Sequence, residues 1–376
     1  MKPYIIVGAG IIGASAAYHL AKKGVNVLLV DRQEPGKATD AAAGIVCPWL
    51  SQRRNQAWYQ LAKNGAKFYP SLINKLEADG EKETGYARVG AISLHVDEGK
   101  LDKMEERVRK RREEAPEIGE ITRLSPAETK ALFPPLRDDF GAVHVSGAAR
   151  VNGKALCQSL IQAAIKHGAT YIHANAQLTF EDTKVTGIHY EGKTVLAEQV
   201  LITAGAWAKE LLLPLGIEFK IEPQKAQIIH LKLENVNTNS WPVVMPPTNQ
   251  YLLSFEKGQV IIGATHENDG GFDQRATAGG IHEILDKALK IAPGLVDGTF
   301  VEVKVGFRPV APDFLPVIGA VSGFKGIIVA NGLGSSGLTV GPYLGSELAK
   351  LALGEETEIS LELYNTVGAM DDYIND

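Results

Sequence analysis

Three glycines and one acid near the start of the chain have the spacing of a dinucleotide-binding site. Gly8, Gly10 and Gly13 form a GxGxxG pattern, and Asp31 ends the apolar run that follows it. The first glycine permits a tight turn, the second lets the backbone approach a pyrophosphate, and the third lets a helix pack closely on a strand. Asp31 would bind a ribose hydroxyl, and its charge argues against a 2′-phosphate and hence against NADP, without separating NAD from FAD.

The residues around these glycines predict the elements that must position them. The short apolar run Tyr4–Val7 is typical of a parallel strand that is covered on both faces. A helix with a small apolar side follows and ends at Gly24, and residues 25–30 then form a second strand. The stretch therefore predicts a complete βαβ unit, whose helix N-terminus offers N–H groups to an anion.

Composition limits the class of protein. With 376 residues, the chain is longer than a domain with a single hydrophobic core usually is, and its length suits two domains. The net charge of −5 gives no general attraction to nucleic acid, and acids interleave the basic residues of the charged stretch 101–114 as on a solvated helix. Cys47 and Cys157 are too few for a disulfide framework or a zinc site. With neither a signal peptide nor a membrane span in the sequence, we expect a cytoplasmic protein with no metal site and no nucleic-acid partner.

In the second half of the chain, from Ile217 onward, the pattern changes to the alternation of an antiparallel sheet. In QIIHLKLE, residues 229, 231 and 233 are apolar, whereas His230, Lys232 and Glu234 share the opposite face, which we expect to be exposed. Residues 251–255, 259–263 and 300–307 are predicted as further strands, with a helix over 277–292. In the last strand one face carries Val301, Val303, Val305 and Phe307, and the other carries Glu302, Lys304 and Arg308.

Four ordered segments resemble the D-amino acid oxidase and glycine oxidase family of FAD-dependent oxidoreductases. They are the opening fingerprint, TAGAWA, VGFRPVAPDFLPVIG and NGLGSSGLTVG, and together they span nearly the whole chain. The small residues 39–44 are similar to a family segment that lies along FAD. Gly332, Gly334 and Gly337 also spell GxGxxG, but no strand ending in an acid follows, so we predict no second dinucleotide site there. The resemblance instead puts this loop at the flavin ring.

The resemblance implies an α/β fold in which an α+β substrate domain, built on an antiparallel sheet, is inserted into a Rossmann-like FAD-binding domain. We expect residues 1–85, 146–216 and 311–376 to form the FAD-binding domain, and residues 86–145 and 217–310 to form the substrate domain. FAD would be non-covalent, because related sarcosine oxidases attach flavin through a cysteine in the C-terminal half and this chain has none after Cys157. The implied cofactor-binding residues are Gly8, Gly10, Ile12, Gly13, Asp31, Arg32, Thr39, Ala43, Gly44, Ile45, Gln177, Ala204, Gly205, Trp207, Gly306, Arg308, Gly332, Leu333, Gly334, Ser335, Ser336, Gly337, Leu338 and Thr339.

Three residues are candidates for substrate binding or catalysis. VGFRPVAPDFLPVIG is similar to a family motif whose arginine, here Arg308, pairs with the substrate carboxylate, and a guanidinium fork suits that anion. Tyr251 stands at a position resembling a substrate-site tyrosine. His266 lies near the place where sarcosine-oxidase-like relatives have a lysine that supplies positive charge beside the flavin. From the residues alone, each has an alternative without a role in catalysis. Arg308 could be a surface charge, Tyr251 a half-buried aromatic residue of the sheet, and His266 a polar residue at the sheet edge.

The implied reaction is FAD-dependent oxidation of the C–N bond of an amino acid or N-substituted amino acid. Hydride would pass from the substrate α-carbon to flavin N5, giving an imine that hydrolyses to an oxo acid. The electron acceptor would be molecular oxygen or another oxidant, and a homo-oligomer is compatible with the sequence. Two alternatives stay open, an FAD-dependent 2-hydroxy acid oxidoreductase and a non-enzymatic flavin-binding protein.

Overall fold

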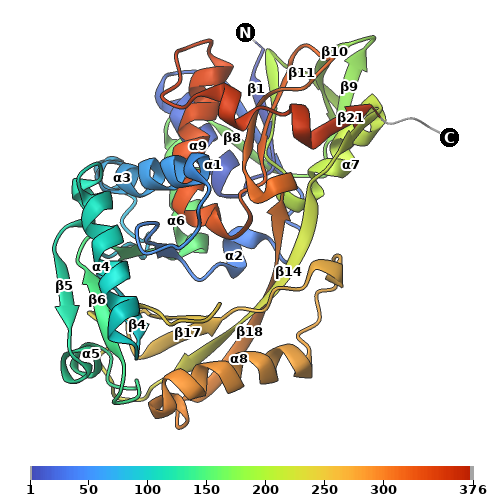
Figure 1. Ribbon diagram of the computed structural model, residues 1–376. Coiled ribbons are helices and arrows are strands. Elements are labelled where there is room, and N and C mark those ends of the chain that lie inside the picture. The colour runs from blue at the N-terminus through green and yellow to red at the C-terminus, as the bar shows by residue number, and fades with distance from the viewer. Residues whose placement is uncertain (1, 373–376) are drawn as a thin grey trace.

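A six-stranded sheet organises one half of the computed structural model, which describes residues 2–372 (Figure 1). The strands lie in the order β19 (Val317–Ala320), β20 (Ile327–Asn331), β12 (Gln199–Ile202), β1 (Tyr4–Val7), β2 (Val27–Asp31) and β8 (Thr170–His173). β19 is antiparallel to β20, and all other neighbours are parallel. The predicted α/β, Rossmann-like core is confirmed.

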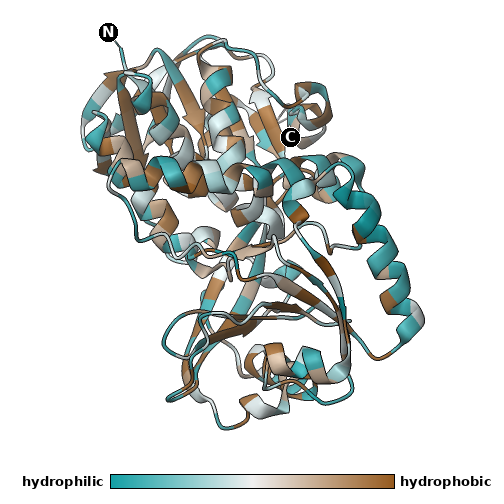
Figure 2. Ribbon diagram, turned by 90° about the vertical axis from the view of Figure 1, so that its left-hand side faces the viewer, coloured by the Kyte–Doolittle hydropathy of each residue, from teal (hydrophilic) through white to brown (hydrophobic). Residues whose placement is uncertain are grey.

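Both faces of this sheet are covered, because alternate residues of its strands point to opposite sides. Ile6 and Leu29 pack under the helices α1 (Ile11–Lys22), α6 (Gly153–Lys166) and α9 (Gly337–Ala352). Ile5 and Val30 face the three-stranded sheet of β9 (Gln177–Glu181), β10 (Lys184–Tyr190) and β11 (Lys193–Leu196). Figure 2 shows hydrophobic residues concentrated in the strands. Further elements of this half are α2 (Ala38–Ala41), β3 (Ile45–Val46), α3 (Gln56–Ala78), β7 (Ala149–Arg150), α7 (Ala208–Leu212), β13 (Ile217–Phe219) and β21 (Met370–Asp372).

The other half is built on an eight-stranded sheet. Its order is β18 (Thr299–Val310), β14 (Glu222–Lys232), β17 (Gln259–Gly263), β16 (Tyr251–Ser254), β15 (Val243–Met245), β4 (Ala91–His95), β6 (Gly141–Val145) and β5 (Ile121–Leu124). All pairs are antiparallel except β15 with β4, which is parallel. These two strands come from separate stretches of chain, so no hairpin fixes their relative direction.

Helices cover the outer face of this sheet. α8 (Ala278–Ile291) lies below β14 and β18 in Figure 1, and α5 (Pro126–Leu132) lies at the opposite end. α4 (Glu98–Arg112) covers the other face, because its buried Leu101, Met104 and Val108 belong to the same core cluster as Val143 and Val145. α8 begins after Thr277, and α5 begins with the capping box that the sequence predicts at Ser125. Within residues 2–372 no helix is long and apolar enough to cross a membrane, and no cluster of three or more His, Cys, Asp or Glu side chains is suited to a metal ion.

One expectation for this sheet was wrong. His230 is only 3% exposed, because the inner face of the sheet packs on the rest of the molecule instead of on water. Burial and the nearby charge of Lys304 lower the pKa of His230 to about 4. At the start of β18, a β-bulge at Val301 interrupts the pairing with β14, and Val301 is 53% exposed.

Candidate active site

A pocket lies where the carboxyl ends of β1, β2 and β12 meet β14, β16 and β18 of the second sheet. Ligands of open α/β sheets bind at such strand ends. The residues lining it come from the opening fingerprint, residues 31–45, 174–176, 203–207, 226–228, 306–309 and 331–338, with Tyr251. The two sheets therefore bring together segments that are far apart in the sequence.

The fingerprint glycines have the geometry that a pyrophosphate site needs. Gly8 has φ +106°, and a Cβ on Gly13 would lie 1.9 Å from the Gly8 oxygen, so these two close the turn against α1. A Cβ on Gly10 would meet only Thr39 Oγ1, at 3.5 Å, and would otherwise project into open pocket. Gly10 is also the N-cap of α1, where the helix dipole favours an anion. This part of the pocket fits the phosphates of FAD.

Asp31 both lines the pocket and holds the fingerprint loop. Its Oδ2 accepts a hydrogen bond from Ala9 N at 2.7 Å, and its Oδ1 accepts from Gln33 N at 2.6 Å and lies 3.1 Å from Lys37 Nζ. Arg32 and Lys37 also line this end of the pocket. The sequence analysis did not predict Lys37 as a residue of this pocket. Its position six residues after Asp31, the acid at the end of a strand, could have indicated that role.

Small residues close the middle of the pocket. Thr39, Ala43, Gly44 and Ile45 all line it. A Cβ on Gly306 would lie 2.6 Å from the Ala41 side chain, so the absence of bulk lets α2 pack against β18. Thr39 Oγ1 accepts from Ile11 N at 3.1 Å and thereby ties this segment to the start of α1.

The second glycine-rich loop forms another wall. Leu333, Gly334, Ser335, Gly337 and Leu338 line the pocket at the start of α9, which no side chain caps. Ala204, Gly205 and Trp207 lie across from them, and Asn331 Nδ2 donates to Gly205 O at 2.9 Å. Backbone N–H groups at this helix start would stabilise negative charge on a reduced flavin.

Some predicted cofactor residues lie outside the pocket lining but support it. Gly13 packs against Gly8, Gly332 adopts φ +79° in the loop, Ser336 accepts from Trp58 Nε1 at 2.7 Å, and Thr339 donates to Ile45 O at 2.9 Å. Gln177 is exposed on β9, and Ala174, Asn175 and Ala176 line the pocket in its place. They directly follow β8, so the rule that ligands bind at strand ends could have identified them.

Arg308 and Tyr251 meet at the substrate-domain side of the pocket. Arg308 Nη1 donates to Gln224 Oε1 at 3.0 Å, and a hydrogen bond joins the guanidinium to the Tyr251 hydroxyl. Burial lowers the pKa of Arg308, which the Tyr251 contact opposes. Burial raises the pKa of Tyr251, so its hydroxyl keeps its proton at neutral pH. The site therefore presents a cation and a neutral hydroxyl to the cavity. Gln224 was missed because only the register of β14 on β18 places it opposite Arg308.

His266 does not line the pocket. It lies on the exposed loop after β17, although its ring approaches Arg308. Desolvation of the ring and the positive charge of Arg308 lower the pKa of His266. These observations favour a neutral imidazole at neutral pH, which would not supply the positive charge that the resemblance to sarcosine-oxidase-like relatives implied beside the flavin.

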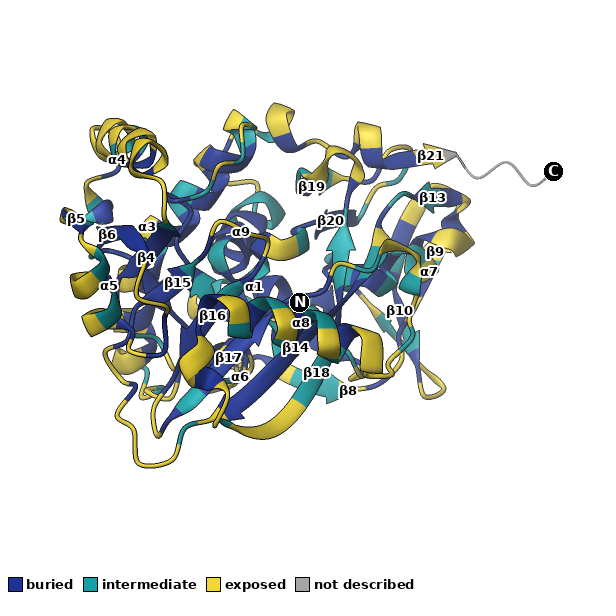
Figure 3. Cartoon of the chain, turned by 60° about the horizontal axis from the view of Figure 1, so that its bottom comes forward, coloured by how far each residue is buried: buried dark blue, intermediate teal, exposed yellow. Residues whose placement is uncertain are grey.

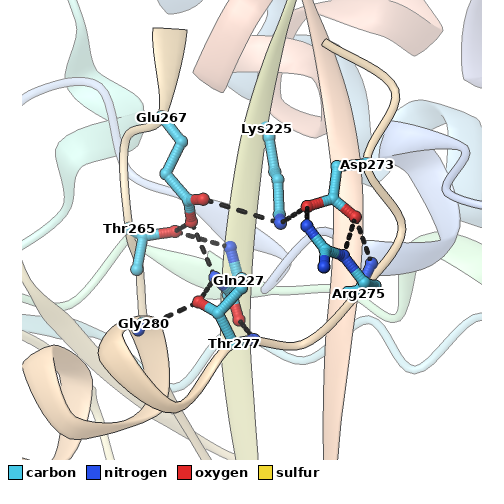
Figure 4. Close-up of polar contacts among 8 residues, drawn as sticks. All are labelled: Lys225, Gln227, Thr265, Glu267, Asp273, Arg275, Thr277 and Gly280. Carbon is cyan, nitrogen blue, oxygen red and sulfur yellow. Dashed lines mark hydrogen bonds and ion pairs between the residues drawn. The ribbon is translucent and has the colours of Figure 1, made fainter. Parts of the chain in front are cut away.

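The loop after β17 is fastened to the back of β14 by a polar network (Figure 4). Lys225, only 1% exposed, lies 3.2 Å from Asp273 Oδ2 and 3.6 Å from Glu267 Oε2. Gln227 donates to Glu267 and accepts from Thr277 N, which links the loop to the start of α8. At the tip of the loop, the Phe272 ring stacks on Trp207 with centroids 5.2 Å apart. The loop therefore connects the second sheet to the pocket wall.

Comparisons with known proteins agree with this geometry. Residues 3–351 match the sequence profile of the DAO family, described as FAD dependent oxidoreductase. An uncharacterized oxidoreductase, YurR, of Bacillus subtilis (strain 168) is 64% identical over 98% of this chain and 100% of its own length. Glycine oxidase of Pseudomonas aeruginosa PAO1 is 30% identical over 97% of this chain and 99% of its own.

Solved structures give the same result. Iminodiacetate oxidase from Chelativorans sp. BNC1 superposes with a TM-score of 0.94 at 46% identity, covering 96% of this chain and 98% of its own. Glycine oxidase from Geobacillus kaustophilus gives 0.84 at 26% identity, covering 97% and 98%. The chain therefore belongs to the DAO family of FAD-dependent oxidoreductases.

Proposed function

We propose that this enzyme oxidises the C–N bond of an amino acid or, preferentially, of an N-carboxymethyl amine such as iminodiacetate. The observation that carries the proposal is the Arg308 guanidinium, which lines the FAD pocket between Gln224 and the Tyr251 hydroxyl. The guanidinium fork matches the geometry of a carboxylate, to which it can donate two parallel hydrogen bonds. The 46% identity to an iminodiacetate oxidase supports a secondary amine with a carboxymethyl group.

The chain's own residues would bind and orient the substrate. Arg308 would hold one carboxylate, with Gln224 fixing the plane of the guanidinium and the Tyr251 hydroxyl donating a hydrogen bond to the same anion. FAD, when bound, supplies the hydride acceptor that oxidises the carbon next to nitrogen. Gly8, Gly10 and the start of α1 would hold its phosphates, and Asp31 would hold a ribose hydroxyl.

A substrate panel tests the proposal. The holoenzyme is mixed anaerobically with iminodiacetate, glycine, N-methylglycine, proline and both enantiomers of alanine, and the flavin absorbance is followed. We expect bleaching by at least one amine and the fastest bleaching by iminodiacetate. Glycolate and lactate report the alternative 2-hydroxy acid chemistry. Bleaching by a hydroxy acid alone, or by no small carboxylate at all, would refute the amine-oxidising assignment.

We further infer that FAD is held without a covalent bond. The two cysteines are buried, at 5% and 6% exposure, and neither Cys47 nor Cys157 lines the pocket. Burial raises the pKa of each thiol to about 12, which disfavours the thiolate that attachment would need. Acid precipitation should release all the flavin into the supernatant, and yellow colour retained in the pellet would contradict the inference.

A further inference from the structure

The loop between β17 and α8, residues 264–277, backs one wall of the FAD pocket without lining the pocket itself. Trp207 and Phe307 belong to that wall, and the ring of Phe272 in the loop contacts both of them. Phe272 stacks on Trp207 with an interplanar angle of 17°, and it meets Phe307 edge-on with centroids 5.2 Å apart. Trp207 and Phe307 also contact each other, at 6.1 Å, so the three rings form one cluster.

This aromatic cluster joins the two halves of the molecule. Trp207 follows β12 of the six-stranded sheet, whereas Phe307 lies on β18 and Phe272 follows β17, both in the eight-stranded sheet. The FAD pocket is lined by residues of both halves. A ligand enclosed between two halves can enter or leave only when contacts between them open.

The loop has the exposure expected of a segment that can open by itself. Most residues from 266 to 276 are exposed, and Phe272 is 42% exposed although its ring makes two aromatic contacts. Segments that bury little apolar surface open at a lower free-energy cost than the core does. Opening of the loop therefore does not require either sheet to unfold.

A buried ammonium group holds the loop beside the aromatic cluster. Lys225 Nζ lies 3.2 Å from Asp273 Oδ2 and 3.6 Å from Glu267 Oε2. Lys225 pairs with Phe307 in the register of β14 on β18, and Asp273 directly follows Phe272, so the ion pairs and the rings adjoin. β14 is largely buried, whereas α8 has many exposed residues (Figure 3). Opening the loop would separate a buried cation from both of its carboxylates, which favours the closed position.

We propose that this loop is a gate for the cofactor, which opens to let FAD enter or leave and which the Phe272 ring and the Lys225 ion pairs hold shut. The contacts that close the gate join protein side chains to one another, so the closed position does not depend on FAD. The gate therefore slows FAD in both directions. The proposal rests on the inference that FAD is held without a covalent bond.

Two rate constants test the gate. Association is followed by the change in flavin fluorescence when apoprotein is mixed with FAD, and dissociation by the release of free FAD when the holoenzyme is diluted. Phe272→Ala should raise both rate constants by about threefold to tenfold, because losing aromatic contacts of this kind favours the open loop. The dissociation constant of FAD, which is the ratio of the two, should change by less than about twofold. Lys225→Met should also raise both rate constants.

Matched variants separate the gate from a general loss of packing. Phe272→Tyr keeps the stacked ring and should retain both wild-type rate constants. Phe300→Ala removes a ring of similar exposure, 49%, from the other end of β18, and Lys232→Met removes an exposed ammonium group from β14; both should match wild type. Full flavin content at saturating FAD shows that each variant has folded.

The two rate constants also give the results that would overturn the gate. An increase in the dissociation rate constant alone would show that Phe272 only supports the pocket wall. Rate constants of Phe272→Ala equal to those of wild type would show that the loop does not limit the passage of FAD. Yellow colour retained in the acid-precipitated pellet would instead refute non-covalent binding, and the gate with it, before any rate is measured.

Discussion

At the scale of the residue, the site is defined by one cation that two neutral groups position. Gln224 and Tyr251 are the hydrogen-bond partners of Arg308, and neither is an acid. No protein carboxylate therefore neutralises the guanidinium, and its charge is available to a bound anion. A cation held in this way at the pocket wall suits an anionic substrate better than a structural ion pair would.

Removing that cation should weaken substrate binding and leave the cofactor in place. Arg308→Leu should raise the dissociation constant of the bleaching substrate by at least about tenfold, because a lost charge-assisted hydrogen bond costs about 1.5–3 kcal/mol. Anaerobic flavin titration measures the constant. Arg112→Leu, an exposed arginine on α4, is the matched control. Wild-type affinity in Arg308→Leu, at equal FAD content, would place the carboxylate clamp elsewhere.

Gly10 should matter to the cofactor and not to folding. Its φ of −73° is accessible to any residue, and a Cβ there meets nothing closer than Thr39 Oγ1 at 3.5 Å. Gly10→Val should therefore fold but yield colourless protein, since the side chain occupies the position of the phosphates. Flavin absorbance per protein and circular dichroism measure the two effects. Gly279→Val, where a Cβ meets nothing within 4 Å, is the control and should stay yellow.

At the scale of the element, the loop between β17 and α8 depends on a buried ammonium group. Burial alone would raise the pKa of Glu267, but hydrogen bonds from Thr265 and Gln227 and the charge of Lys225 lower it. Hydrogen bonds from Arg275 hold the pKa of Asp273 far below its usual range. For a carboxyl with a lowered pKa, stability is present above the unfolded value and is lost as pH falls through the folded one. The loop should thus stay fastened at neutral pH and loosen only in acid.

Removing the ammonium group should release the loop at neutral pH. Lys225→Met leaves two carboxylates that are about 30% exposed and can be hydrated, so the free energy of unfolding should fall by about 1–3 kcal/mol. Urea denaturation measures this change. Trypsin should cut after Arg275, on the loosened loop, faster than in wild type. Lys232→Met, on the same strand but 48% exposed, is the control and should match wild type in both measurements.

At the scale of the whole molecule, the sequence predicted the structural features that depend on local residue patterns. The βαβ fingerprint, the helix boundaries at Ser125 and Thr277 and the alternation of Ile229 and Leu231 all depend on residues close in the chain. It could not predict the parallel pairing of β4 with β15, the Gln224–Arg308 contact or the Lys225 network. These depend on which sheet register and which loop the folded chain brings together. His230 was misjudged for the same reason, since its face is covered by a distant segment.

That buried histidine gives a test of acid stability. Burial and the charge of Lys304 lower the pKa of His230 from an ordinary 6.5 to about 4 in the folded protein. Burial likewise lowers the pKa of His19 to about 4. Between the unfolded pKa of 6.5 and the folded pKa of about 4, the unfolded chain takes up protons that the folded protein does not. The free energy of unfolding therefore falls as pH falls, by up to about 1.4 kcal/mol per pH unit for each histidine.

His230→Gln removes one of these groups and should flatten the pH dependence. Its free energy of unfolding, measured by urea denaturation at pH 7, 6, 5 and 4.5, should decline less steeply below pH 6.5 than that of wild type. The difference should grow toward pH 4.5, because the unfolded wild-type chain gains its proton there while folded His230 stays neutral. His282→Gln, an exposed histidine on α8, should run parallel to wild type. Parallel curves for His230→Gln as well would show that folded His230 takes up a proton as readily as the unfolded chain does.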